Sequence, residues 1–431
     1  MFFKKQKFSV FRLLFSVCFY YLCTIIDYCA DMRSIKEIFI IGKGPSSSHT
    51  MGPKKASVKI REEYPNAAAY RVTLYGSLAA TGKGHLTDMA INEVFEGVAP
   101  VDIVWCAQQY LPYHPNAMKF EMLDSEGNVT DSQVIYSIGG GTIVLEGEEN
   151  NASDHIYPMT TMTEIMTWCN KTGKSYWEYV FENEEEDVKD YLLEVWQTMR
   201  AAIENGLANE GVLPGALHLR RKAASYYVRS RGYNGILRTR GMLFAYALAV
   251  SEENASGGTI VTAPTCGSCG IVPAVLYHLQ KEYCFNDAQI VRSLATAGLV
   301  GTIVKANASV SGAEVGCQGE VGVACAMAAA AASQLMGGSP NQIEYAAEMA
   351  LEHHLGMTCD PMCGLVQIPC IERNAMAAAR AIDAQIYSFY TDGIHRVSFD
   401  SVVKVMKRTG HDLPSLYKET SEGGLGRLKI E

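Results

Sequence analysis

The spacing of hydrophobic residues divides the chain into a first third with strand patterns and a remainder with helical patterns. Residues 70–75 (YRVTLY) and 118–123 (MKFEML) alternate apolar and polar side chains, as a strand with one buried face does. Residues 101–106 (VDIVWC) and 134–144 (VIYSIGGGTIV) predict two further short strands, and SIGGGT within the latter predicts a tight turn. Residues 35–41 (IKEIFII) predict a strand or a first helical turn.

Helical spacing dominates after the polar stretch EGEENNASD near residue 150. The segments that predict helices are residues 160–211, 217–230, 243–251, 289–306, 326–332 and 345–351. We find no clear alternating strand among them, and the acidic run FENEEEDVKDYL is typical of a solvated helix face. The pattern therefore predicts an α+β domain at residues 32–150, followed by an all-α, mostly helical domain at residues 155–431.

Residues 1–31 have a basic start and an uncharged run of 14 residues from Leu13 to Ile26. That run is shorter than the ~20 residues of a membrane-spanning helix, and Tyr28-Cys29-Ala30 is a poor signal-peptidase site. We favour an upstream start assigned in error, with Met32 as the true start, over a signal-like leader. Residues 1–31 hold four basic and two acidic residues, so without them the net charge of −9 becomes −11.

The composition is that of a globular protein, with 48% hydrophobic and 19% charged residues. The negative net charge argues against nucleic acid or an anionic membrane as the main partner, and we expect no stable membrane association. Thirteen cysteines are too few for a disulfide scaffold and cluster late in the chain, which indicates reduced thiols in the cytoplasm, some of them bound to metal.

Two loops in the first domain carry candidate binding chemistry. Residues 42–56 (GKGPSSSHTMGPKKA) place serines, a histidine and a threonine at a helix start, where hydroxyls and backbone amides bind anions or simply cap the helix. Residues 76–95 contain TGKGH, which fails the phosphate-loop pattern because no hydroxyl residue follows Lys83. His85 and Asp88, three residues apart, fit a capping turn or a histidine oriented by a carboxylate.

Residues 352–374 (EHHLGMTCDPMCGLVQIPCIERN) gather two histidines and three cysteines between helical segments. A further cysteine, Cys317, precedes them in a glycine-punctuated segment, and the cluster indicates a metal site. Cys266 and Cys269 form a CxxC pair without the second pair of a zinc site. Four other cysteines are expected to pack as small hydrophobic residues, namely Cys106, Cys169, Cys284 and Cys325.

Taken together, these motifs resemble the iron–sulfur L-serine dehydratases, from about Met32 to the end of the chain. GPSSSHTMGP, TGKGHLTD, SIGGG, TAPTCGSCGIVPAV, GAEVGCQGEVGVACAMAAA and HHLGMTCDPMCGLVQIPCIERNA occur in the order of that family. The resemblance implies that the helical domain is catalytic and that Cys317, Cys359 and Cys370 hold a [4Fe–4S] cluster. Three ligands rather than four would leave one iron open as a Lewis acid for loss of water from L-serine, giving pyruvate and ammonia.

The resemblance also suggests roles for the two loops. Ser47, Ser48 and Thr50 are expected to hold the substrate carboxylate, and Arg373 and Asn374 to complete the anion clamp. His49 and His85 are candidates for proton transfer, with Asp88 as the orienting carboxylate. His353 and His354 are expected to end or cap the preceding helix. We also expect a homodimer, although the sequence identifies no interface.

The sequence departs from the family pattern at two places. Cys363 stands where a small residue is common, and we expect it to pack rather than to serve as an alternate ligand. Some members end in a cysteine that covers the open iron, whereas this chain ends in GGLGRLKIE.

Three rival functions stay open at this point. The first is an iron–sulfur dehydratase of another small hydroxy or amino acid. The second is a pyridoxal-phosphate lyase, for which Lys305 is a weak Schiff-base candidate. The third is a zinc-stabilised protein that binds a small anion and is not an enzyme.

Overall fold

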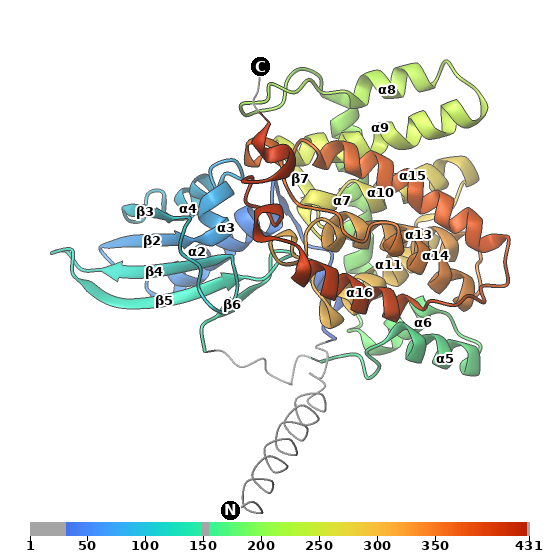
Figure 1. Cartoon of the computed structure of the whole chain (residues 1–431), viewed down its shortest axis with the longest axis horizontal. Helices are drawn as coiled ribbons and strands as arrows, with labels where there is room; N and C mark the ends of the chain where they lie inside the picture. Colours follow the sequence, from blue (N-terminus) through green and yellow to red (C-terminus); the bar gives the residue numbers. More distant parts are fainter. Residues whose placement is uncertain (1–31, 148–154, 429–431) are drawn as a thin grey trace, which may run out of the picture.

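A five-stranded sheet with helices occupies the first part of the chain, and a large helical body forms the rest (Figure 1). The computed structural model describes residues 32–147 and 155–428. Predictions that concern residues 1–31 and most of the polar connection near residue 150 therefore lie outside the described residues. Within these ranges, the predicted α+β region followed by a mostly helical region is confirmed.

All four predicted strand segments form the sheet. The strands are β2 (Ala69–Tyr75), β3 (Val101–Cys106), β4 (Ala117–Leu123), β5 (Val129–Ser137) and β6 (Ile143–Leu145), in the order β3-β2-β4-β5-β6. β2 and β3 are parallel and the other pairs are antiparallel. The predicted tight turn lies between β5 and β6, where Gly139, Gly140 and Gly141 all have positive φ, which glycine adopts without strain.

Helices α2 (Gly52–Glu63), α3 (Gly76–Thr81) and α4 (Thr87–Phe95) accompany this sheet. Tyr70, Val72 and Leu74 of β2 are buried at alternate positions and belong to one core with Ile60 of α2 and Ile91 of α4. Residues 76–95 form two helices rather than one, and left-handed Leu86 (φ 57°) lies directly before the second. The loop between them, residues 82–86, carries His85 to the helical body.

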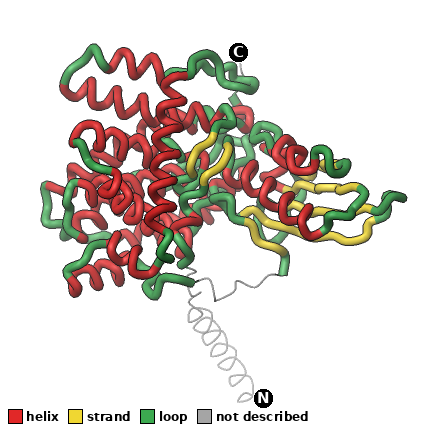
Figure 2. The backbone as a smooth tube through the Cα atoms, turned by 180° about the vertical axis from the view of Figure 1, so that it is seen from behind, coloured by secondary structure: helices red, strands yellow, loops and turns green. Residues whose placement is uncertain are grey.

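The helical body contains twelve α-helices among the described residues. They are α5 (Met162–Thr172), α6 (Tyr176–Asn183), α7 (Val188–Ala208), α8 (Ala223–Ser230), α9 (Gly235–Ala255), α10 (Ile271–Tyr283), α11 (Asp287–Asn307), α12 (Gly312–Val315), α13 (Val323–Leu335), α14 (Pro340–Glu352), α15 (Cys370–Phe389) and α16 (Phe399–Asp412). Seen from behind, these helices form most of the molecule and lie to one side of the sheet (Figure 2). Each predicted helical segment contains a helix, but residues 217–222 of the segment predicted at 217–230 precede α8 and are not helical.

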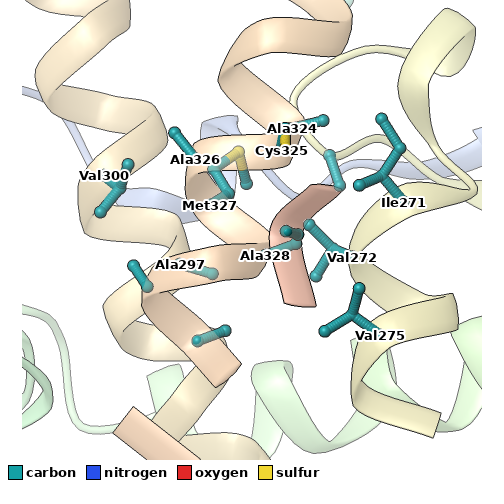
Figure 3. Packing of buried hydrophobic residues seen from close by; sticks show 14 of the residues in the cluster. Ile271, Val272, Val275, Ala297, Val300, Ala324, Cys325, Ala326, Met327 and Ala328 are labelled. Carbon is teal, nitrogen blue, oxygen red and sulfur yellow. The ribbon is translucent and has the colours of Figure 1, made fainter. Parts of the chain in front are cut away.

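The alanine-rich helix α13 lies at the centre of this body. It contacts α10, α11, α14 and α15, and twelve of its residues are buried. Figure 3 shows Ala324, Ala326 and Ala328 between Val300 of α11 and Val272 of α10. Small side chains on all faces let the surrounding helices approach closely, which produces a dense interior.

The N-terminal segment before α2 belongs to the helical body rather than to the sheet. Met32, Ile35 and Phe39 lie in the helical core, after which β1 (Ile41–Lys43) pairs antiparallel with β7 (Thr259–Val261). The prediction that residues 155–431 are all-α is therefore wrong at β7. The sequence did not indicate β7 because a three-residue strand is too short to show an alternating pattern. No helix in the described part of the chain is long and apolar enough to cross a membrane.

Candidate metal centre and active site

Three cysteines from separate segments are buried near one carboxylate, and we call Cys317, Glu320, Cys359 and Cys370 the thiol group. Cys317 precedes the π-helical turn η5 (Gln318–Gly322), Cys359 lies in the loop after α14, and Cys370 begins α15. Glu320 Oε2 is 3.6 Å from Cys317 Sγ and 3.7 Å from Cys359 Sγ, so these three residues can hold a metal ion. Cys370 lies outside that tight trio but interacts electrostatically with Cys317 and Glu320.

Two glycines leave space for this group where any side chain would collide with it. A Cβ atom at Gly312 would lie 2.5 Å from Glu320 Oε2 and 3.1 Å from Cys359 Sγ. At Gly267 it would lie 3.0 Å from Glu320 Oε1, which accepts a hydrogen bond from Thr265 Oγ1 at 2.8 Å. The motifs GAEVGC and TCGSC thus place glycine backbone, which carries no side chain, against the Glu320 carboxylate.

Burial favours the protonated forms of three members of the thiol group, Cys359, Cys370 and Glu320. A hydrogen bond with Cys317, burial and nearby negative charge raise the pKa of Cys359 well above its ordinary value. Burial likewise raises the pKa values of Cys370 and Glu320. Arg373 adds a positive charge beside the three thiols; its Nη1 donates to Thr358 O at 2.7 Å and its Nη2 lies 3.7 Å from Asp360 Oδ1. Such thiols become ligands only when a metal lowers their pKa.

On the other side of the site is the histidine group, which we define as His49, His85, His114 and Glu419. His49 lies in the π-helical turn η2 (Ser47–Met51), which Ser46 caps through its Oγ. The Nδ1 atom of His49 is 2.9 Å from Ser48 Oγ, and its Nε2 atom is 3.2 Å from Ser77 Oγ. The His85 ring packs edge-on against the His49 ring with centroids 4.5 Å apart.

Glu419 reaches this group from the far end of the chain. Its Oε1 atom is 3.4 Å from His49 Nδ1, while its Oε2 atom has no hydrogen-bond partner among the described residues. A left-handed backbone (φ 59°) and a hydrogen bond from its N–H to Cys359 O at 2.7 Å hold it in place. Glu419 also interacts electrostatically with Cys317 and Glu320, so it lies between the two groups.

Burial favours the neutral forms of the histidine group. It lowers the pKa values of His49 and His114 to about 4 and lowers that of His85 well below its ordinary value. Burial and the neighbouring acidic groups Glu320 and Cys317 raise the pKa of Glu419 well above the usual range. His49 is therefore neutral at neutral pH, so its contact with Glu419 is not an ion pair.

His114 and Asn116 were not predicted from the sequence, and they supply unpaired polar atoms beside His49. Both amide atoms of the fully buried Asn116 and the Nε2 atoms of His114 and His85 make no hydrogen bond within residues 32–147 and 155–428. The loop that carries them, between β3 and β4, reaches α3 through a hydrogen bond from Ser77 N to Pro115 O at 3.2 Å. Buried polar atoms without partners are costly, so these atoms are suited to a polar ligand.

Other predicted site residues are placed as follows. Ser47 and Ser48 are buried in η2 beside His49, whereas Thr50 Oγ1 donates to His85 O at 2.7 Å and joins the two loops. Asp88 lies in the first turn of α4, where its Oδ1 accepts from Met89 N at 2.9 Å, and within the described structure no hydrogen bond joins it to His85.

Asn374 braces the first turn of α15. It accepts from Gly270 N at 2.9 Å and donates to Gly267 O and Cys370 O. His353 ends α14, and the Nδ1 atoms of His353 and His354 each bond to a carbonyl oxygen of that helix. This confirms the prediction for both histidines.

The remaining cysteines divide into buried and exposed thiols. Cys266 and Cys269 are buried free thiols, and Cys266 Sγ lies 3.8 Å from Met51 Sδ. Cys169 and Cys325 are buried as predicted, and Cys106 is half-buried. The prediction of packing is wrong for Cys284 and Cys363, because both are exposed on left-handed turns (φ 56° and 55°) that direct them away from the core.

Two cavities flank this region, and the smaller one touches the site. A cavity of about 790 Å³ is lined by Ser77, Pro115 and Thr420 on one side and by Lys407, Arg408 and Lys418 on the other. A larger cavity of about 1670 Å³ between β1, α2 and α4 has no cysteine or histidine in its lining. We take the smaller cavity as the approach to the site because its lining includes Ser77, which is bonded to His49, together with three basic and two acidic side chains.

Comparison with known proteins decides the family. The family model described as serine dehydratase beta chain matches residues 34–103, and that of the serine dehydratase alpha chain matches residues 106–426. The chain belongs to the serine dehydratase family. It is 42% identical to the L-serine dehydratase of Streptomyces coelicolor, over 92% of this chain and 99% of that protein. L-serine dehydratase 1 of Escherichia coli is 41% identical, over 93% of this chain and 100% of that protein. The L-serine dehydratase of Helicobacter pylori is 36% identical, over 91% of this chain and 98% of that protein.

The two family models meet within β3, between residues 103 and 106. The serine dehydratase beta region thus contributes His49 and His85, and the alpha region contributes His114, Glu419 and the thiol group. In this serine dehydratase family member, both regions are parts of one chain.

Proposed function

We propose that this chain is an iron–sulfur L-serine dehydratase that eliminates water from L-serine and releases pyruvate and ammonia. The observation that carries the proposal is the meeting of a buried thiol group with a neutral histidine group, with Glu419 between them. The first group is suited to a metal cofactor and the second to proton transfer. The names of the relatives supply the substrate.

The donor set fits a [4Fe–4S] cluster held by Cys317, Cys359 and Cys370. Three thiols converge at a site with two buried carboxylic acids, and Cys370 lies outside the tight trio, as suits a cofactor larger than one ion. When bound through three protein ligands, such a cluster supplies an open iron that acts as a Lewis acid toward a hydroxyl group. The trio of Cys317, Glu320 and Cys359 is also compatible with a single zinc ion, which keeps the zinc-stabilised binding protein as the alternative.

Substrate binding is assigned to the π-helical turn η2 and to the loop with Asn116. Ser47 and Ser48 lie at the start of the helical segment that continues into α2, where amides and hydroxyls favour a carboxylate. The Asn116 amide offers both a donor and an acceptor to the carboxylate and ammonium of an amino acid. Arg373 and Asn374 act indirectly in this proposal, because their hydrogen bonds hold the loop of Cys359 and the start of α15.

Proton transfer is assigned to the histidine group. His85 is neutral and its Nε2 atom has no partner in the described ranges, so it is able to accept the Cα proton. His49 is held between Ser48 and Ser77 and is the second candidate. Loss of the Cα proton and of the β-hydroxyl as water gives aminoacrylate, which hydrolyses in water to pyruvate and ammonia. Glu419 takes the orienting role for which Asp88 was proposed, because Glu419 contacts His49.

The decisive experiment is anaerobic purification followed by a pyruvate assay with L-serine, with D-serine and L-threonine as controls. We expect pyruvate from L-serine, a broad brown absorbance that disappears in air, and iron with sulfide in the protein. Zinc without iron or sulfide, and no pyruvate, would favour the binding protein. A visible band bleached by borohydride would favour a lysine aldimine. The structure argues against Lys305 as its lysine, because Lys305 Nζ already bonds to Glu37 at 2.8 Å and to Thr142 at 2.9 Å.

The proposal also includes a cellular compartment. An iron–sulfur enzyme with the free thiols described above requires reducing conditions, so we expect it in the cytoplasm. Purification in air should then abolish turnover, and reconstitution with iron and sulfide under reducing conditions should restore it.

A further inference from the structure

The carboxylate of Glu320 lies among the three cysteines of the thiol group. Its Oε2 atom is 3.6 Å from Cys317 Sγ and 3.7 Å from Cys359 Sγ, and the side chain also interacts electrostatically with Cys370. A side chain that reaches all three thiols lies where a group held by those thiols would be. The role of Glu320 toward such a group has not been assigned above.

A short, fixed turn brings Glu320 to this position. Glu320 follows Cys317 by three residues, and its N–H donates to Cys317 O at 3.2 Å within the π-helical turn η5. Residues three apart on a helical turn share one face, so the carboxylate and the thiol point in the same direction. The turn runs directly into α13, the buried helix at the centre of the helical body, which holds it in place.

The two oxygens of Glu320 have different surroundings. Oε1 accepts a hydrogen bond from Thr265 Oγ1 at 2.8 Å, whereas Oε2 faces the thiols. Backbone at Gly267 and Gly312 packs against the carboxylate, because a Cβ atom would lie 3.0 Å from Oε1 at the first position and 2.5 Å from Oε2 at the second. The carboxylate is therefore oriented before any cofactor binds, with one oxygen held and the other presented to the thiols.

Two other side chains could compete for the same role. Within the described ranges, the possible ligand atoms fall into two sets, in which Glu419 stands with two histidines and Glu320 stands with two thiols. Cys266 Sγ lies 3.8 Å from Met51 Sδ, and in the part of the chain that the structure describes it makes no hydrogen bond to a cysteine of the thiol group. The geometry therefore favours Glu320 over both.

We propose that Glu320 is the fourth ligand of the cluster in the resting enzyme and gives up this position when L-serine binds. The inference rests on the proposed function, because it concerns the iron that three cysteines leave open. A carboxylate is a harder ligand than a thiolate, so it occupies this iron less firmly than a fourth cysteine would. The exchange replaces one oxygen ligand with another: the carboxylate oxygen leaves, the hydroxyl oxygen of serine takes its place, and no electron is transferred.

The burial of Glu320 makes this ligand open to a direct test. Glu320 is half-buried, whereas Cys317, Cys359 and Cys370 are buried, so solvent reaches the site from the side of the carboxylate. If the carboxylate is removed, water should enter and bind the iron in its place. Whether a solvent oxygen is bound to the cluster therefore distinguishes an iron occupied by Glu320 from an open one.

The test is electron–nuclear double resonance on the dithionite-reduced cluster, in water enriched in oxygen-17. The wild type without substrate should show no coupling to solvent oxygen, whereas Glu320→Ala should show it. In air, Glu320→Ala should lose the fourth iron at least about tenfold faster, measured by the EPR signal of the three-iron cluster. Glu372→Ala is the matched control, at an exposed glutamate of α15 that pairs with Lys222, and should behave as the wild type in both measurements.

Solvent oxygen bound to the wild-type cluster before substrate is added would overturn the proposal, and this measurement needs no variant. Absence of coupling in Glu320→Ala with an intact cluster would overturn it as well, and coupling in Glu419→Gln alone would assign the position to Glu419. If Glu320→Ala assembles no cluster, Thr265→Val decides, because it removes only the hydrogen bond to Oε1; iron loss at the wild-type rate in that variant would count against Glu320. A wild type without iron and sulfide would instead contradict the proposed function itself.

Discussion

The thiol group and the histidine group are equally buried, yet they are incomplete in different ways. In the thiol group, burial raises the pKa values of Cys359, Cys370 and Glu320, so the ligands are uncharged until a cation arrives. In the histidine group the side chains are already in a usable neutral form, and what they lack is a partner for atoms such as His85 Nε2 within the described residues. The first group is suited to a permanent cofactor and the second to a ligand that comes and goes.

Replacing a thiol ligand should have the largest effect. Cys317→Ser, Cys359→Ser or Cys370→Ser should each remove the visible cluster absorbance and lower kcat by about a thousandfold or more, because loss of a Lewis acid costs several kcal/mol. Iron and sulfide analysis with the pyruvate assay measures both losses. Cys325→Ser, at a buried thiol that donates to Ala377 O at 3.2 Å, is the control and should keep the cluster. A full cluster in any of the three variants would remove that cysteine from the ligand set.

Replacing His85 should separate the role of the histidine group in turnover from the role of the thiol group in holding the cluster. His85→Asn should lower kcat by about 10²- to 10⁴-fold, as removal of a general base does, while iron content and absorbance stay at the wild-type level. His353→Asn, at an exposed histidine on the end of α14, should leave kcat unchanged. Normal turnover by His85→Asn would transfer the role of base to His49.

The sequence predicted the two groups unequally. The three cysteines of the thiol group lie near glycine or proline in two segments, around Cys317 and in residues 352–374, and the family resemblance assigned them together, whereas Glu320 was not predicted. The histidine group draws on four segments, and only His49 and His85 lie in recognisable loops. Glu419 sits in an ordinary polar stretch, and its backbone bond to Cys359 O, which brings it to the site, leaves no pattern in the sequence.

The fold was predictable wherever burial is periodic. The alternation in β2 and the helical spacing of α7 report directly which faces are buried. The pairing of β1 with β7 was not predictable, because three-residue strands carry no period. Left-handed turns at Leu86, Cys284 and Cys363 were also missed, since these residue types rarely adopt positive φ and nothing local signals it.

Replacing Glu419 should have an intermediate effect on catalysis. Glu419→Gln keeps the size of the side chain but weakens the contact with His49, and the loss of a buried polar partner costs about 1–3 kcal/mol. We therefore expect kcat to fall by about 10- to 100-fold with the cluster retained. Glu422→Gln, three residues further on and exposed, is the matched control. A loss of iron in Glu419→Gln would place this residue with the thiol group instead.

The pH dependence of stability should reveal the neutral histidines, with the smallest effect of the four. The pKa of His114 is about 4 in the folded state against 6.5 when solvated, so the unfolded chain binds a proton that the folded chain does not as pH falls below 6.5. His114 therefore contributes stability that is present above 6.5 and is lost toward pH 4, by up to about 3 kcal/mol. In urea unfolding between pH 7 and pH 5, His114→Gln should lose less stability than the wild type, whereas His353→Gln should follow the wild type. If the free energy of unfolding falls equally with pH in His114→Gln and in the wild type, His114 is not buried in its neutral form. The histidine group would then lose the property that distinguishes it from the thiol group.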